Sequence, residues 1–377
     1  MKEYKKIWLS SPHMGGKERI LVEETFDMNW IAPVGPHIVR FEENLSSISE
    51  NFNIAALSSG TSAIHLALIL AGVKQGDNVI CSSFTFSASA NPIKYLGANP
   101  IFVDSEQESW NMCPDLLHNA ITEAVLSNKK PKAIVLVHLY GMPAKINTVL
   151  EIAGEFNIPV IEDAAEALGS KYKNQQLGTF GDFGIYSFNG NKIITTSAGG
   201  ALVCNDKKQI DKAKFLATQS RDIANHYEHS EIGYNYRMSN VCAAIGIGQL
   251  EYLSDRVCKK REIFNFYKRE LSMIKSISFL EESKYSFSNY WLTTILLDKK
   301  CAIDKEKLRL HLEKNNIESR PLWKPMHLQP VFKDCTSYVN GVSEDLFNRG
   351  LCLPSGTNMT THNIRRVVDT IKELYEI

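Results

Sequence analysis

The chain has 377 residues, and its 42 basic and 42 acidic residues give a formal net charge of zero at neutral pH. Hydrophobic residues make up 44% of the sequence and charged residues 22%, a composition typical of globular proteins with a sizeable core. The balanced charge argues against a nucleic-acid partner. No apolar run approaches the roughly 18 residues that a membrane-spanning helix needs, so we expect no membrane segment. The length predicts two or three domains.

The N-terminal residues and the cysteines bear on where the protein resides. The stretch MKEYKKIWLSSPHMGG is basic at its start but has no hydrophobic region behind it, so we expect no signal peptide. Eight cysteines are scattered without a Cys-x-x-Cys pair, at positions 81, 113, 204, 242, 258, 301, 335 and 352. We interpret them as reduced, mostly buried thiols of a cytoplasmic protein, with no metal site among them.

The N-terminal segment up to residue 40 is predicted to be mostly irregular, with a short helix over Lys17–Phe26 and another beginning near Ile38. A short apolar strand at residues 55–57 then leads into Ser-Ser-Gly-Thr-Ser and an Ala- and Leu-rich helix. Small polar residues at a helix start leave backbone N–H groups free at the positive end of the dipole, which suits a phosphate. A simple N-cap by Ser59 or Thr61 explains the same residues, and the pattern leaves both interpretations open.

Strand-like runs alternate with helical segments as far as residue 204. The strands are expected at Asn78–Cys81, Pro100–Val103, Ala133–His138, Pro159–Ile161, Phe183–Phe188 and Ala201–Cys204. Helices are expected between several of them, at Ser87–Leu96, Asp115–Leu126 and Ala144–Phe156. This alternation predicts an α/β domain with a mostly parallel sheet covered by helices on both faces. Ligands of such sheets bind at the carboxyl ends of the strands.

Several residues that could take part in binding or catalysis follow these strands. Phe86 comes shortly after the strand at 78–81, and Asp163 follows the strand at 159–161. Ser187 and Lys192 lie at the end of the strand that begins at residue 183. A charged lysine is rarely buried without a partner, so Lys192 either reaches the surface or takes part in chemistry. Taken singly, Asp163 is explained as well by an N-cap role, and Phe86 by a place in the core.

Taken together, these residues match the needs of pyridoxal 5′-phosphate (PLP). Its aldehyde needs a lysine, for which Lys192 is the candidate. Its pyridine nitrogen needs a carboxylate, which Asp163 would supply. Its phosphate needs the N–H and hydroxyl donors of a helix start, and its flat ring needs a face such as Phe86. The sequence therefore predicts a PLP site in the α/β domain.

The second half of the chain is mainly helical and ends in a smaller α+β unit. Helices are expected at Lys207–Thr218, Asn240–Leu253, Ser254–Met273, Lys305–Lys314, Ser343–Arg349 and Thr361–Tyr375, and strands at Tyr290–Leu297 and Ile317–Pro321. The loop between the first two helices is too long for a plain connector, and its two histidines match no standard metal spacing. We expect a large PLP-binding domain over residues 1–255, whose segment 1–40 contributes to the active site, and a small domain over residues 256–377.

Motifs along nearly the whole chain resemble those of one enzyme family. The matching stretches are SSGTSAIHLAL, SSFTFSASANPI, IEDAAEALGS, GTFGDFGIYSFNGNKIITTSAGG, GYNYRMSNVCAAIG, SRPLWKPMH and CLPSGTNMT. In this combination they are similar to the DegT/DnrJ/EryC/StrS family of PLP-dependent nucleotide-sugar aminotransferases. The resemblance implies the PLP-dependent transferase fold of type I, a large domain with a mixed, mostly parallel sheet between helices and a smaller C-terminal α+β domain. Alanine at position 198 departs from the glycine that we expect there.

The resemblance also implies which residues bind the cofactor. Lys192 would bind the aldehyde and act as the catalytic residue, and Asp163 would pair with the pyridine nitrogen. Glu166 would lie near the ring hydroxyl, and Phe86 would stack on the ring. The residues implied for the phosphate are Thr61, Ser62, Ser187 and, from the neighbouring subunit, Asn235.

The implied contacts to the nucleotide sugar come from four parts of the chain. They are Trp30, Ile31, Ala32, Pro33, Ser59, Arg237, Lys324, Pro325, Met326 and His327. Because Asn235 would act across a subunit boundary, the resemblance also implies a homodimer with shared active sites.

The strongest likeness is to transaminases that make UDP-4-amino-4,6-dideoxy-N-acetylglucosamine, the bacillosamine precursor, and to similar enzymes of exopolysaccharide clusters. It rests on LSSPHMGGKE, NWIAPVGP and YSFNGNKIITT. The implied reaction moves an amino group from L-glutamate to C4 of a UDP-4-keto-6-deoxy-N-acetylhexosamine. One alternative is the same chemistry on a GDP- or dTDP-linked sugar of the perosamine type. Another is a PLP-dependent sugar dehydratase, although such relatives carry histidine in place of Lys192. A third alternative is a non-catalytic PLP-binding sensor or regulator, but nothing in the chain supplies a DNA-binding element or a basic face.

Overall fold

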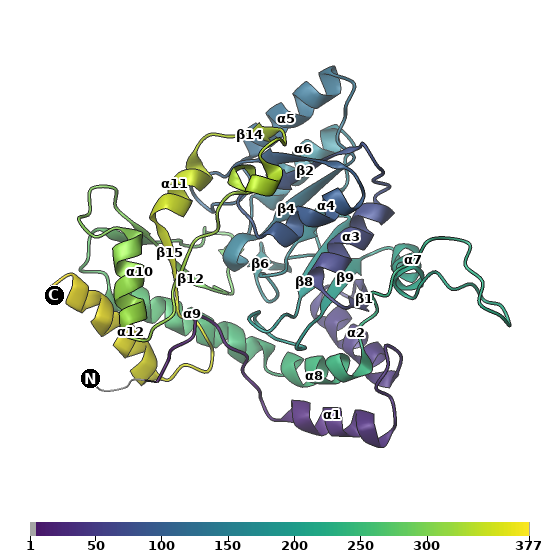
Figure 1. Cartoon of the computed structure of the whole chain (residues 1–377), viewed down its shortest axis with the longest axis horizontal. Helices are drawn as coiled ribbons and strands as arrows, with labels where there is room; N and C mark the ends of the chain where they lie inside the picture. The colour runs from purple at the N-terminus through teal and green to yellow at the C-terminus, as the bar shows by residue number, and fades with distance from the viewer. Residues whose placement is uncertain (1–4, 377) are drawn as a thin grey trace.

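A large, mostly parallel sheet forms the centre of the structure, a computed structural model that describes residues 5–376 (Figure 1). In spatial order its strands are β1 (Asn53–Leu57), β9 (Gly200–Cys204), β8 (Phe183–Ser187), β5 (Val160–Asp163), β4 (Ala133–Val137), β2 (Asn78–Ser82), β3 (Asn99–Val103) and β14 (Ser337–Tyr338). Strand β9 runs antiparallel to both of its neighbours, and the other pairs in this sheet are parallel. The predicted α/β class is confirmed.

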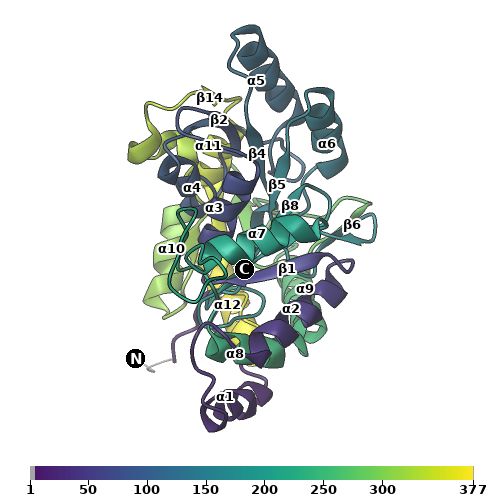
Figure 2. The ribbon, with the colours of Figure 1, turned by 90° about the vertical axis from the view of Figure 1, so that its right-hand side faces the viewer.

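Helices cover both faces of this sheet. They are α1 (Lys17–Asp27), α2 (Pro36–Ile48), α3 (Gly60–Leu70), α4 (Asn91–Tyr95), α5 (Pro114–Leu126), α6 (Ile146–Glu155), α7 (Lys207–Ala217) and α8 (Asn240–Leu250). Successive strand residues point to opposite faces. On β2, Val79 and Cys81 belong to one hydrophobic cluster with residues of α3, α4 and α7, whereas Ile80 belongs to another with residues of α5 and α6. Figure 2 shows α3 and α4 on one side of the sheet and α6 on the other. Helices α1, α2 and α8 complete the second face. Strands buried on both sides are continuously apolar, which made them visible in the sequence.

A second, antiparallel sheet carries the C-terminal part of the chain. Its strands, in spatial order, are β10 (Ile277–Phe279), β12 (Thr293–Leu297), β15 (Gly350–Leu353) and β13 (Arg320–Pro321). The helices of this part are α9 (Leu253–Glu270), α10 (Lys305–Lys314), α11 (Val342–Arg349) and α12 (Thr361–Leu374). Ile7 is buried in the same hydrophobic core, so the N-terminal segment packs here before the chain crosses to α1. The smaller α+β unit is therefore present, while a boundary at residue 255 stays a prediction.

The C-terminal part of the chain also returns to the large sheet, which the sequence did not predict. Strand β14 pairs in parallel with β3 at the sheet edge. Phe332 packs against Phe102 with ring centroids 5.2 Å apart. The Asp104 carboxylate accepts hydrogen bonds from the backbone N–H groups of Asn340, Gly341 and Ser343. A two-residue strand has no readable pattern of its own, so only its distant partner identifies it.

The remaining differences are local. The strand expected at Ile317–Pro321 is shorter, because Ile317 forms only an isolated bridge with Ile7 and β13 begins at residue 320. The segment between α7 and α8 projects from the body of the molecule (Figure 1) and exposes Ile223, Tyr227 and Ile232. Among the described residues, no helix combines the length and apolar character needed to cross a membrane.

Candidate active site

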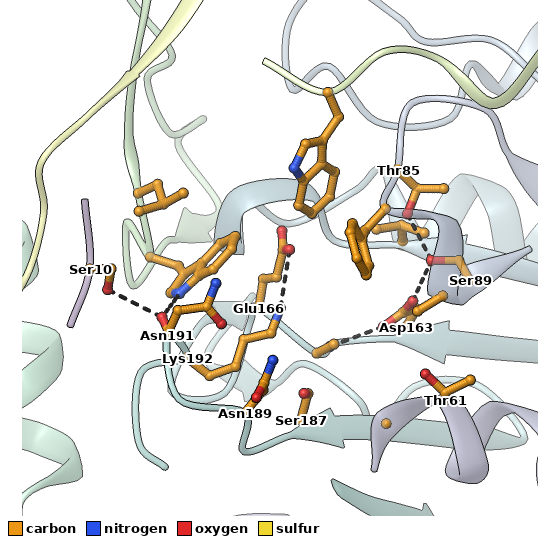
Figure 3. Close-up of a pocket in the computed structure, with 18 of the residues that line it drawn as sticks. Ser10, Thr61, Thr85, Ser89, Asp163, Glu166, Ser187, Asn189, Asn191 and Lys192 are labelled. Atoms are coloured by element: carbon orange, nitrogen blue, oxygen red, sulfur yellow. Dashed lines mark hydrogen bonds and ion pairs between the residues drawn. The ribbon is translucent and has the colours of Figure 1, made fainter. Parts of the chain in front are cut away.

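A cavity of about 700 Å³ opens where the carboxyl ends of β5 and β8 meet the start of α3 (Figure 3). Leu9 of the N-terminal segment closes its other side together with residues beside the second sheet, Trp291 before β12 and Trp323 after β13. The predicted site residues that line it are Ser59, Thr61, Phe86, Asp163, Glu166, Ser187 and Lys192. The structure thus brings together the lysine, the carboxylates, the helix start and the aromatic ring that the sequence pointed to separately.

The start of α3 offers donors for an anionic group. Ser59 caps the helix by accepting from the Ser62 N–H at 3.0 Å. The N–H groups of Gly60 and Thr61 precede the first intrahelical bond and have no partner within the helix. Within residues 5–376, the hydroxyls of Thr61 and Ser187 make no hydrogen bond and line the same cavity. The N-cap and the phosphate interpretations are therefore compatible, since the cap uses a different hydroxyl.

Close backbone packing brings this helix start against β8 and β9. A Cβ on Gly200 would lie 2.4 Å from the Gly60 nitrogen, so only glycine fits at the start of β9. A Cβ on Gly60 would lie 3.2 Å from the Cβ of Ser187. The expected need for glycine at position 198 is not seen, because the left-handed residue of this turn is Ser197, at φ 71°. Ala198 is compatible with the fold for that reason.

Asp163 lies at the end of β5 with its carboxylate held by two donors. The Ser89 hydroxyl donates to Oδ2 at 2.6 Å, and the Ala165 N–H approaches Oδ1 at 3.1 Å. Ser89 is in turn hydrogen-bonded to Thr85 at 2.7 Å, so a short chain of hydroxyls fixes the carboxylate (Figure 3). Asp163 is buried yet lines the cavity. A carboxylate held in this way can accept one further hydrogen bond from a ligand.

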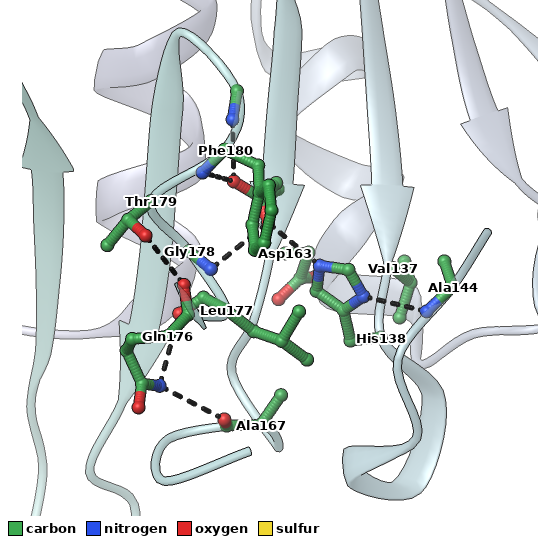
Figure 4. Close-up of polar contacts among 12 residues, drawn as sticks. Val137, His138, Ala144, Asp163, Ala167, Gln176, Leu177, Gly178, Thr179 and Phe180 are labelled. Atoms are coloured by element: carbon green, nitrogen blue, oxygen red, sulfur yellow. Dashed lines mark hydrogen bonds and ion pairs between the residues drawn. The ribbon is translucent and has the colours of Figure 1, made fainter. Parts of the chain in front are cut away.

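The adjacent residue, Glu162, does not line the cavity and instead joins His138, which follows β4, to the turn before β8 that contains Gly178 and Phe180 (Figure 4). Its fully buried carboxylate accepts hydrogen bonds from the N–H groups of Gly178, Phe180 and Gly181, at 3.0, 2.6 and 2.7 Å. His138 completes the set at 3.0 Å. Because the Ala144 N–H donates to His138 Nδ1, the proton of the neutral ring lies on Nε2 and faces Glu162. This network fixes the ends of β4 and β5 and the turn before β8.

Lys192 and Glu166 form an ion pair within the cavity. Lys192 Nζ lies 3.3 Å from Glu166 Oε1, and its side chain is 13% exposed. The other Glu166 oxygen accepts from the Tyr140 N–H at 2.7 Å. Burial raises the pKa of Glu166 to about 7, although the ammonium of Lys192 opposes the rise. The carboxyl can therefore gain or lose a proton near neutral pH, within reach of the lysine.

Aromatic side chains form a wall of the cavity. Phe86 is 56% exposed, which rules out a place in the core. Its ring lies 5.6 Å from Trp323, which packs 5.1 Å from Tyr140. Tyr140 also stacks on Trp291 at 6.3 Å, and the Trp291 ring lies 4.3 Å from the ammonium of Lys192. Flat rings of this kind suit an aromatic cofactor and the apolar face of a sugar.

The other predicted site residues do not line this cavity in the single chain. The Ser62 hydroxyl accepts from the Ser59 N–H within the capping box of α3, and Arg237 pairs with Glu42. Asn235 is exposed at the base of the projecting segment. The residues Trp30, Ile31, Ala32 and Pro33 form an exposed turn before α2. In the segment of Lys324, Pro325, Met326 and His327, the Met326 N–H donates to the Ser83 carbonyl at 2.7 Å, and His327 Nδ1 is hydrogen-bonded to the Ser83 hydroxyl at 2.6 Å. Burial lowers the pKa of His327.

The donor set of the cavity fits PLP. The helix start with Thr61 and Ser187 can hold a phosphate, and Asp163 can accept from a protonated ring nitrogen. Lys192 is an amine within the same cavity, and Phe86 is exposed beside it. The fold and the site therefore define an α/β enzyme of the PLP-dependent transferase class.

Comparison with known proteins identifies the family. Residues 12–372 match the DegT/DnrJ/EryC1/StrS aminotransferase family, and the chain belongs to it. It is 51% identical to "Putative pyridoxal phosphate-dependent aminotransferase EpsN" of Bacillus subtilis (strain 168), covering 99% of this chain and 96% of that protein. It is 41% identical to GDP-perosamine synthase of Escherichia coli O157:H7, covering 98% and 99%.

Solved structures agree with this assignment. An aminotransferase of the same family from Brucella abortus superposes with a TM-score of 0.89 at 27% identity, over 96% of both chains. The PLP form of "Putative sugar aminotransferase Spr1654" from Streptococcus pneumoniae superposes with a TM-score of 0.91 at 25% identity, over 99% of both. The predicted cofactor is confirmed, and the chain is a PLP-dependent sugar aminotransferase.

Several residues of the cavity and of the packing around it were not identified from the sequence. Ser89 lies within the matching stretch SSFTFSASANPI, but nothing marks it as the partner of Asp163. Trp291 and Tyr140 follow ordinary strand and loop patterns. Trp323 could have been identified, because it lies between two prolines in the irregular segment Arg-Pro-Leu-Trp-Lys-Pro, which is unusual for a plain loop. These residues meet only through long-range packing.

Proposed function

We propose that the protein transfers an amino group from L-glutamate to C4 of a UDP-4-keto-6-deoxy-N-acetylhexosamine, giving a UDP-4-amino-4,6-dideoxy sugar for glycan or polysaccharide synthesis. The observation that carries the proposal is the convergence of Lys192, Asp163 and Glu166 on one cavity beside the start of α3. Both half-reactions would use this cavity in turn, since donor and acceptor share one cofactor.

The chain's own residues supply orientation and proton transfer. PLP bound here would carry the amino group and accept electrons from the carbon that loses its proton. Asp163 would keep the ring nitrogen protonated, with its own orientation set by Ser89. Lys192 would move the proton to and from the carbon that bears nitrogen, and Glu166 would hold the lysine amine between its transfers.

The relatives support a second candidate for the nucleotide. The name of the Bacillus subtilis relative with 51% identity specifies its cofactor and no substrate. Three relatives at 41%, 35% and 34% identity are named GDP-perosamine synthases, which favours a GDP-linked 4-keto-6-deoxy sugar as a second candidate. Both candidates keep the same donor and the same C4 chemistry.

A panel of UDP-, GDP- and dTDP-linked 4-keto-6-deoxy sugars, each incubated with L-glutamate, tests the assignment by product mass. Amination of the UDP sugar at the highest kcat/KM supports the proposal, and a preference for the GDP sugar replaces it with the second candidate. Incubation without an amino donor tests for a dehydratase, which would yield a deoxygenated product. Full turnover by Lys192→Ala would rule out the catalytic role of this lysine.

We also propose a homodimer whose subunits complete each other's sites. The exposed apolar side chains of the projecting segment and of the turn after α1 support a contact between copies, among them Ile223, Ile232 and Trp30. Asn235 lies at the base of that segment, outside its own chain's cavity. Mixing Lys192→Ala with Asn235→Ala chains should restore activity that neither variant has. A fully active monomer in sedimentation would contradict the proposal.

A further inference from the structure

Lys260 is a buried lysine outside the site residues described above. It lies on α9 and is 1% exposed, and it forms no ion pair with a carboxylate of residues 5–376. Burial lowers the pKa of its amine to about 7. An amine that is removed from water without a counter-charge costs stability, and an apolar side chain of similar length would avoid that cost. A buried lysine in this position therefore calls for a role other than stability.

The amine of Lys260 joins three parts of the chain. Nζ donates to the main-chain carbonyls of Trp291, just before β12, and of Ser355, just after β15, at 2.7 and 2.9 Å. It also reaches the hydroxyl of Ser10 in the N-terminal segment at 3.5 Å. The side chain thus links α9 to the second sheet and to the segment that closes the cavity.

Two of these partners, Trp291 and Ser10, also contact the backbone of Asn191, the residue before Lys192. Trp291 Nε1 donates to the Asn191 carbonyl at 2.7 Å, and the Ser10 hydroxyl donates to the same oxygen at 3.2 Å (Figure 3). The Trp291 ring also lies 4.3 Å from the ammonium of Lys192. Trp291 therefore restrains both the backbone and the amine of the lysine. A cavity of only about 10 Å³, room for about one water, lies between Lys192 and Lys260.

We propose that Lys260 is a positioning residue for Lys192. By holding Trp291 and Ser10, it fixes the Asn191 carbonyl and keeps the Lys192 amine between the Trp291 ring and Glu166. The inference rests on the proposed role of Lys192 in proton transfer. A misplacement of about 1 Å at a reacting group can cost roughly a hundredfold in rate, so this support is large enough to matter.

The test replaces Lys260 by methionine, which keeps the length of the side chain and removes its donors. Lys259→Met is the matched control, because Lys259 is the neighbouring residue on α9 and pairs with Glu262 at the surface. We expect Lys260→Met to lower kcat for the glutamate half-reaction of the holoenzyme by roughly tenfold to a hundredfold, with KM little changed. The cofactor-free protein should unfold at an equal or higher temperature.

A second readout is independent of turnover. In the cofactor-free chain, the rate at which an acylating reagent labels Lys192, followed by peptide mass spectrometry, should rise by roughly two- to fivefold in Lys260→Met, because the contact with the Trp291 ring is loosened. Lys259→Met should match the wild type in every measurement. Unchanged kcat and labelling in Lys260→Met would overturn the proposal, as would a loss of kcat that only accompanies a lower unfolding temperature.

Trp291→Phe tests the same set of contacts in a chain that keeps Lys260, so the result does not depend on how the lysine variant folds. It keeps a ring and removes the donor to the Asn191 carbonyl. Labelling of Lys192 should again increase, and the double variant should be no slower than the slower single variant, because both changes interrupt one path. Additive losses would overturn the proposal. Activity retained in Lys192→Ala would instead remove the proposed role of Lys192, which separates the two failures.

Discussion

Replacing Glu166 by glutamine should change how the stability of the cofactor-free protein depends on pH. The carboxyl is 4% exposed, and its pKa rises from 4.5 to about 7 because burial disfavours the charged form. Between these two pH values the folded chain keeps a proton that the unfolded chain has released. The contribution of Glu166 to the free energy of unfolding must therefore fall as pH rises through this window. The difference between 4.5 and about 7 corresponds to about 3 kcal/mol.

Urea denaturation at a single protein concentration, between pH 5 and pH 8, measures this effect. Glutamine keeps the shape of the side chain but cannot ionise, so the stability of Glu166→Gln relative to the wild type should grow by up to about 3 kcal/mol toward pH 8. Glu23→Gln is the control, because Glu23 is an exposed carboxylate on α1 paired with Arg19. The reasoning is refuted if the difference between Glu166→Gln and the wild type does not vary with pH, or narrows toward pH 8.

Two further predictions concern the walls of the cavity. Ser89→Ala removes the donor to Asp163 Oδ2 and should lower the free energy of unfolding by about 2 kcal/mol, measured by urea denaturation at pH 7, whereas an equal stability would mean that water replaces the hydroxyl. Gly200→Ala places a Cβ 2.4 Å from the Gly60 nitrogen and should cost about 1–3 kcal/mol and weaken PLP binding in a cofactor titration. Gly154→Ala, whose Cβ would meet nothing within 4 Å, should leave PLP binding unchanged.

The large sheet was predictable because its strands are short apolar runs separated by helices. Burial on both faces makes each run continuous, and Phe183–Ser187 was located almost to the residue. The same argument fails for β14, which is two residues long and depends on a partner far along the chain, and it locates β13 only as the end of a longer expected strand. Pairing over such a distance leaves no local trace in composition or periodicity.

The candidate site was predictable where one residue type is needed for the chemistry. Lys192 and Asp163 follow strands whose ends share one edge, so their meeting could be inferred from topology. Ser89, Tyr140 and Trp291 act by supporting those groups, and many residue types could do so. Their roles follow from hydrogen bonds and ring contacts that only the folded chain shows.

The pairing of β14 with β3 has a consequence for the order of assembly. Residues 99–103 are synthesised before residues 337–338, so the edge of β3 lacks its β14 partner until most of the chain has been made. An open strand edge is a template for pairing with another chain. Until Phe332 and β14 arrive, Phe102 also lacks the ring that packs against it. The last third of the chain therefore protects the first third from mispairing, and early termination before residue 332 should yield an aggregating product.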